Sequence, residues 1–154
     1  MLNKPIRDKV AISVISGTLG TLVMYLFGMP LYFLKVSKII YLMYSIELFV
    51  KPEIARTTFG FIAGMITGLI VGSVLAFGFK LLLEWTGWDW YWLKSFGYGT
   101  VMWFLWVGIA RNFLDVTNYL DKYLLTNMIL LSQSIIYSVS TAYFMQRLWG
   151  KVET

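Results

Sequence analysis

The chain has 154 residues, of which 58% are apolar and only 14% are charged. A soluble domain usually has about 45–50% apolar and about 25% charged residues, and one small core cannot bury this excess, which argues against a water-soluble globule. The absence of Cys and His excludes disulfides, thiol nucleophiles, imidazole bases and Ser-His-Asp triads, and a net charge of +5 from scattered basic residues does not indicate nucleic-acid binding.

Four apolar windows between charged residues are close to the length of a membrane-spanning helix, at 10–34, 57–79, 91–110 and 123–146. Only 95–110 is strictly uncharged in the third window, but Trp90 and Trp92 beside it suit the headgroup layer. Lys94 can direct its charge outward along the helix, so this window can still cross. Because backbone amides in hydrocarbon must be paired within their own segment, we expect all four windows to be helices.

Residues 31–51, between the first and second spans, follow the sequence Gly28-Met29-Pro30, which we expect to end or kink the first helix. At about 100° per residue their apolar side chains share one face, and Lys35 and Lys38 fall near the other. This pattern predicts an amphipathic helix in the membrane interface. A fifth span is the alternative, although residues 38–51 are too short to cross.

The second span has the strongest packing pattern, because glycine recurs every four residues at Gly60, Gly64, Gly68 and Gly72. Close backbone approach, which glycine permits, joins helices in lipid. We therefore expect this glycine zipper to contact another helix and the second span to be the most tightly packed. Gly17 and Gly20 place a similar small-residue face on the first span. Contact within one bundle and contact between copies both fit the pattern.

Three polar side chains are the candidates for a functional role. Glu47 falls in the apolar face of the predicted interfacial helix, where it either pairs with Lys51 or points at the bundle or a lipid headgroup. The amides of Gln133 and Asn127, in the fourth span, either join helices by hydrogen bonds or line a polar path. No pattern typical of a catalytic, cofactor or metal site is present, so we expect no enzyme and no cofactor.

The first helix contains Gly17-x-x-Gly20 and then Gly28-Met29-Pro30, the second is glycine-rich, and Gly97-Tyr98-Gly99-x-x-x-Trp103 opens the third. In this order of features the chain resembles uncharacterised four-span membrane proteins of Gram-positive bacteria, of the YqhR type. The resemblance implies a helix bundle in the bacterial cytoplasmic membrane and no particular mechanism. The basic, amphipathic residues 31–51 depart from that pattern.

These observations predict one all-α membrane domain over residues 1–154, a four-helix bundle with an additional interfacial helix. The basic residues before the first span favour both termini in the cytoplasm. We expect a non-catalytic protein of the lipid bilayer that associates with itself as a homo-oligomer or with a larger membrane complex. One alternative is a small transporter or channel subunit with a polar path along the fourth span. The other is an enzyme acting on lipid through Glu47 or Asp89.

Overall fold

The computed structural model describes residues 8–47, 50, 52–55, 57–110 and 124–149. Among these residues, three helices are long and apolar enough to cross a membrane: α1 (Lys9–Phe33), α4 (Thr58–Thr86) and α7 (Leu124–Trp149). The other helices that the structure describes are shorter: α2 (Tyr41–Glu47), α3 (Pro52–Ala55), α5 (Tyr91–Trp103) and the π-helix η1 (Phe104–Ala110), which follows α5 directly. The described residues are helical and contain no β-strand, so the prediction of an all-α chain with helices of membrane-spanning length and composition is confirmed.

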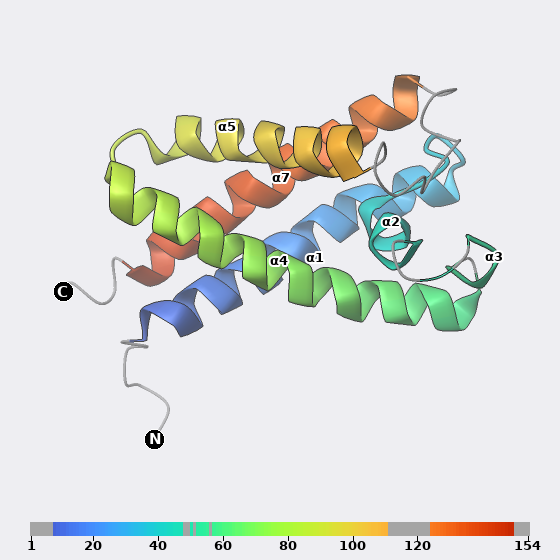
Figure 1. The fold of residues 1–154 in the computed structure, drawn as a ribbon, viewed down its shortest axis with the longest axis horizontal. Helices are drawn as coiled ribbons and strands as arrows, with labels where there is room; N and C mark the ends of the chain where they lie inside the picture. The colour runs from blue at the N-terminus through green and yellow to red at the C-terminus, as the bar shows by residue number, and fades with distance from the viewer. Residues whose placement is uncertain (1–7, 48–49, 51, 56, 111–123, 150–154) are drawn as a thin grey trace.

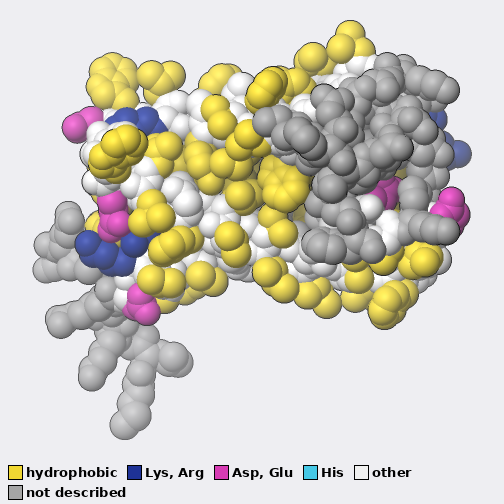
Figure 2. All heavy atoms as spheres, in the orientation of Figure 1, with side chains coloured by type: hydrophobic (Ala, Val, Ile, Leu, Met, Phe, Trp, Pro, Cys, Tyr) yellow, Lys and Arg dark blue, Asp and Glu magenta, His cyan; other side chains and the backbone are white. Residues whose placement is uncertain are grey.

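The helices α1, α4, α5 and α7 lie roughly along one axis of the molecule, and along the chain each of these four runs opposite to the one before it (Figure 1). Hydrophobic side chains cover the middle of the face seen in Figure 2, whereas basic and acidic side chains gather toward its two ends. This distribution matches a bundle whose long axis crosses a bilayer, because charges are costly in hydrocarbon and stable in the headgroup layer.

The first and last described helices begin and end at the same end of the bundle. The Lys9 ammonium, in the first turn of α1, lies 5.1 Å from the ring centroid of Trp149, the last residue of α7. The same ammonium lies 3.6 Å from the Glu84 carboxylate near the end of α4. The start of α1 and the ends of α4 and α7 therefore share one end of the bundle.

The first helix does not end at Pro30, because α1 continues through this residue to Phe33. The helix end is produced instead by Lys35, whose φ of 59° is left-handed. In this conformation the Lys35 N–H donates to the Tyr32 carbonyl and the Val36 N–H donates to the Leu31 carbonyl. These two hydrogen bonds form a Schellman motif, which satisfies carbonyls that the helix end would leave open.

Residues 31–51 do not form the single helix that we expected. Residues 31–33 complete α1, the Schellman motif reverses the chain, and α2 is the helix that follows within the described part of this stretch. On the apolar face that the sequence predicted, Ile39, Ile40 and Met43 are almost fully buried. The apolar face that the sequence predicted for the membrane interface is thus largely buried against the bundle, because the reversed chain brings it there.

The second span is longer than the predicted 57–79, because α4 continues beyond Lys80 to Thr86. Lys80 is buried, with 7% of its surface exposed, and its ammonium lies 3.2 Å from the carboxylate of Glu84 one turn later. Pairing at this spacing offsets part of the cost of keeping a buried charge within the helix.

The glycine face of α4 contacts other elements of the same chain along its length. A Cβ atom added at Gly60 would meet the backbone of α3, and one added at Gly64 would lie 2.5 Å from the Leu42 carbonyl oxygen in α2. Cβ atoms added at Gly68 and Gly72 would collide with side chains of α1. The absence of side chains on this face therefore lets three separate elements approach the α4 backbone.

The two candidate glycines of α1 face different neighbours. A Cβ added at Gly17 would lie 2.5 Å from the Ala76 Cβ of α4, whereas one added at Gly20 would collide with the Thr141 hydroxyl of α7. α1 thus lies between α4 and α7 and contacts both through positions without side chains.

α4 is the least buried of the three spanning helices, so the expectation that it is the most tightly packed is wrong. In its most apolar stretch 22% of the residues are buried, compared with 39% in α1 and 50% in α7. Its contacts follow the narrow glycine face, and the opposite face carries a row of exposed branched side chains, at Ile62, Ile66, Ile70 and Val74.

Single cysteines in this cysteine-free chain test the path of the helices. We expect cysteines at Asn3 and Asp89 to be labelled from one face of the membrane and a cysteine at Leu124 from the other. A membrane-impermeant thiol reagent applied to sealed vesicles makes the measurement. If Asp89 and Leu124 are labelled from the same face, α5 and η1 do not cross.

Replacement of Gly64 by Ala tests the contact between α4 and α2. The added Cβ would press on a backbone oxygen that cannot move aside alone, so we expect a loss of about 1–3 kcal/mol in stability. Gly97→Ala in α5 is the matched control, because a Cβ there would have no neighbour within 4 Å. This control should stabilise the helix by about 0.5–1 kcal/mol in detergent unfolding. Equal effects of the two variants would contradict the assigned contact.

Candidate functional site

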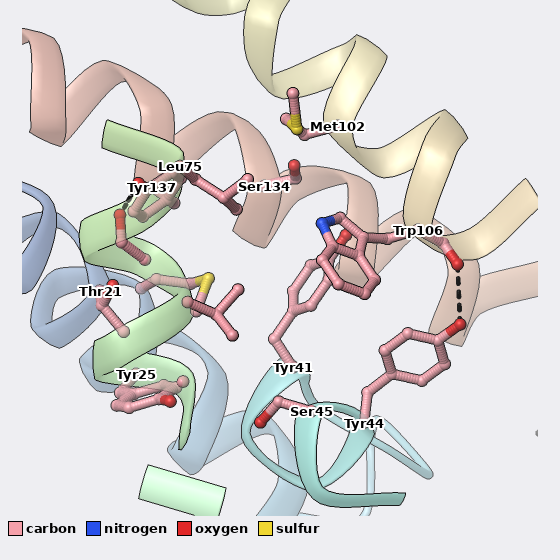
Figure 3. A pocket seen from close by; sticks show the side chains of 14 residues that line it. Thr21, Tyr25, Tyr41, Tyr44, Ser45, Leu75, Met102, Trp106, Ser134 and Tyr137 are labelled. Carbon is pink, nitrogen blue, oxygen red and sulfur yellow. Dashed lines mark hydrogen bonds between the residues drawn. The ribbon is translucent and has the colours of Figure 1, made fainter. Parts of the chain in front are cut away.

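A pocket of about 90 Å³ lies between α4 and α5, with α1, α2 and α7 completing its wall (Figure 3). α4 and α5 are joined by a turn and contact each other little beyond it, so they separate toward the other end of the bundle (Figure 1). The link nearest the pocket is the hydrogen bond from the Tyr98 hydroxyl to the Leu75 carbonyl oxygen, at 2.7 Å. α2 occupies the far end of the space that this divergence leaves.

The pocket is partly open. Most of its half-buried lining residues come from α4 and from α5–η1, among them Val71, Leu75, Met102 and Trp106. The lining residues from α1 and α7 are buried. The opening is therefore on the side where α4 and α5 separate, and it faces the surroundings of the bundle rather than either end.

The pocket wall is mainly apolar, and none of the residues that line it is Asp, Glu, Lys or Arg. Met24 of α1 and Met102 of α5 contribute thioether side chains, and Val71 of α4 contributes an aliphatic one. A wall of this composition favours an apolar occupant and contains no acid–base pair or nucleophile with an activating partner.

Several hydroxyl groups in the wall donate to backbone carbonyls of other helices. The Tyr137 hydroxyl of α7 donates to the Gly72 carbonyl of α4, and the Tyr44 hydroxyl of α2 donates to the Trp106 carbonyl of η1 at 2.7 Å (Figure 3). These bonds connect elements around the pocket and satisfy polar groups that the membrane would leave without a partner.

The Tyr41 hydroxyl is different, because it is buried and forms no hydrogen bond within the described part of the chain. It is turned toward Ser134 of α7, whose own hydroxyl donates to the Gly99 carbonyl at 2.7 Å. The Tyr41 ring extends from α2 toward Trp106 (Figure 3). The Tyr41 hydroxyl therefore has no partner at hydrogen-bond distance within the described residues.

Gln133, a candidate from the sequence, does not line the pocket. Its side chain binds α2, the helix that forms one wall of the pocket. Its side chain is buried, lies against Gly28 of α1, and its Oε1 accepts a hydrogen bond from the Tyr41 N–H at 3.2 Å. This N–H belongs to the first residue of α2, where no helical carbonyl can accept it. Gln133 therefore caps α2 from the neighbouring helix α7.

The other two polar candidates also lie outside the pocket wall. Glu47 is 6% exposed at the last residue of α2, and Lys51, its predicted partner, lies outside the described residues. Asn127 is half-buried in the first turn of α7. The structure brings neither of them together with Gln133 at the pocket.

The sequence pattern did not predict that aromatic side chains would line a pocket. Tyr25 and Tyr137 lie in the middle of apolar windows, too far from the ends for the aromatic belt that usually explains such residues. This position was a signal of an internal role. The positions of Tyr41 and Trp106 in the sequence do not indicate an internal role. Both line the pocket only because α2 lies next to η1 in the fold.

Comparison of this chain with protein-family models, with curated proteins and with solved structures finds no match. Within the described part of the chain, no three acidic residues lie close enough together to hold a metal ion. The pocket is therefore the feature of the described residues that indicates a function.

Replacement of Gln133 by Leu tests the cap on α2. The change keeps the approximate size of the side chain but leaves the Tyr41 N–H without its partner, so we expect a loss of about 1–3 kcal/mol in stability. Ser132→Ala is the control, because the Ser132 hydroxyl bonds only to the Met128 carbonyl of its own helix. Thermal unfolding in detergent makes the comparison, and an unchanged Gln133→Leu protein would rule out the cap.

Proposed function

We propose that this chain is a non-catalytic, four-span membrane protein that binds an apolar molecule from the bilayer between α4 and α5. The observation that carries the proposal is the sideways opening of an apolar pocket in a bundle of membrane-spanning helices. In a bilayer, such an opening faces hydrocarbon rather than water. A lipid chain or a small apolar molecule can then enter without crossing a polar layer, and the apolar lining favours it over water.

The fourth crossing is the continuous helical run of α5 and η1. At 1.5 Å per residue, α5 with η1 reaches about 30 Å, close to the hydrocarbon thickness of a bilayer. The position of Lys9 beside Trp149 supports this count, because a chain that starts and finishes on one side crosses an even number of times. The location in a bacterial cytoplasmic membrane, with both termini inside, belongs to the same proposal, as does the YqhR-type resemblance.

The accessory role in a larger complex is a second candidate, which one specific surface favours. The exposed branched side chains of α4, at Ile62, Ile66, Ile70 and Val74, form a strip that suits lipid or another apolar helix. The glycine faces contact elements of the same chain, so association with a partner or a second copy would use this strip instead.

The contacts of α7 give less support to a transporter or channel with a polar path. Gln133 accepts from the Tyr41 N–H and Ser134 donates to the Gly99 carbonyl, so these side chains bind the backbone of other elements. Such bonds are typical of polar groups that join helices within a membrane protein.

The proposal is tested by a phosphatidylcholine that carries a photoactivatable diazirine at the end of one acyl chain. In vesicles of this lipid, we expect the unmodified protein to be crosslinked at pocket residues such as Leu75 as well as at Ile66 on the outer surface. Met102→Trp, which fills the pocket, should remove the pocket crosslinks and leave those at Ile66.

Val101→Trp is the matched control, because this neighbouring side chain is 52% exposed and does not line the pocket. It should leave both sets of crosslinks unchanged. Absence of pocket crosslinks in the unmodified protein, with normal labelling at Ile66, would overturn the proposed function.

A further inference from the structure

Two hydrogen-bonding groups belong to lining residues on α2 and η1. The first is the buried Tyr41 hydroxyl, which has no partner among the described residues. The second is the indole of Trp106, whose nitrogen edge is directed from η1 toward the middle of the lining side chains (Figure 3). The rest of the wall is mainly apolar or carries hydroxyls that are bonded to backbone carbonyls. The pocket is thus polar at one point and apolar elsewhere.

Tyr41 is held in this position from two sides. Its N–H donates to Gln133 of α7 at 3.2 Å, which sets the start of α2. Its ring makes an edge contact with Tyr44, with centroids 6.3 Å apart and planes at 89°. Because Tyr44 is itself bonded to η1, the Tyr41 ring cannot turn away without disturbing both contacts. The hydroxyl is therefore placed in advance of any ligand.

We infer that the pocket takes an apolar molecule that bears a carbonyl oxygen, and that the Tyr41 hydroxyl donates a hydrogen bond to this oxygen. The inference rests on the proposed function and names its ligand class. An indole N–H only donates, so a group that meets both Tyr41 and Trp106 must accept, and a carbonyl oxygen accepts two hydrogen bonds. A carboxylate or phosphate does not fit, because no Lys or Arg lines the pocket to balance its charge.

Two kinds of bilayer molecule supply this chemistry: a quinone, through a ring carbonyl, and an acyl lipid, through its ester carbonyl. In either case the carbonyl lies beside the Tyr41 hydroxyl, and the apolar remainder extends past Val71 and Met102 toward the opening between α4 and α5. The ring of a quinone or the first methylenes of an ester chain would occupy the apolar part of the wall.

The test measures binding of three probes to the purified full-length protein in detergent, by isothermal titration calorimetry. The probes are decyl-1,4-benzoquinone, methyl myristate and decylbenzene, of which the last has no carbonyl. Tyr41→Phe removes the hydroxyl and keeps the ring. We expect it to weaken binding of at least one carbonyl probe roughly two- to tenfold, the usual range for one neutral hydrogen bond, and to leave decylbenzene unchanged.

Tyr143→Phe is the matched control, because this tyrosine packs against Trp92 and does not line the pocket. It should bind all three probes as the unmodified protein does, and thermal unfolding confirms that both variants are folded. Loss for the quinone alone identifies a quinone, and loss for the ester alone identifies an acyl lipid.

Equal weakening of all three probes, or no weakening of any, would overturn the carbonyl assignment. If the unmodified protein binds none of the probes and shows no pocket crosslinks with the diazirine lipid, the proposed function itself is wrong. Pocket crosslinks that persist while Tyr41→Phe changes nothing would leave the pocket in place and remove only the carbonyl preference.

Discussion

The arrangement of the bundle depends on glycine positions that leave the helix backbone uncovered. Lipid tails are as apolar as leucine, so the hydrophobic effect does not draw helices together in a membrane. A glycine lets a neighbour approach, and it also exposes a carbonyl oxygen that a hydroxyl can reach. Gly72 illustrates both, because its face adjoins Thr21 of α1 and its carbonyl accepts from Tyr137 of α7. The Gly99 carbonyl accepts from Ser134 in the same way.

Polar side chains of α7 accept hydrogen bonds from the backbone of the segment that follows α1. This segment leaves helical geometry at the Schellman motif, and its backbone needs partners where it is enclosed by the bundle. Thr126 accepts from the Lys38 N–H at 3.4 Å, and Gln133 accepts from the Tyr41 N–H. These bonds give a structural role to polar side chains of the fourth apolar window. α7 is the most buried of the three spanning helices because it packs against both α1 and α5.

The pocket is a consequence of unequal packing around α4. The glycine face of this helix is occupied by α1, α2 and α3, so α5 is left to pack mainly on α7. Tyr98 holds α5 to α4 near Leu75, and beyond this point the two helices separate. Tyr41 and Trp106 then line the space that remains. Binding of an apolar molecule would fill a gap that helix packing alone does not close.

The sequence by itself determined the helical class, the membrane environment and most helix positions, because each depends on local composition and on pairing within one segment. It also indicated the glycine face of α4, since a period of four residues is visible in one helix. It did not determine the end of α1, which depends on the left-handed conformation of Lys35, or the burial of α2. Only the tertiary structure could bring Tyr41 and Trp106 into the wall of one pocket and assign Gln133 to the start of α2. These contacts join residues far apart in the chain, and their geometry depends on how several helices pack at once.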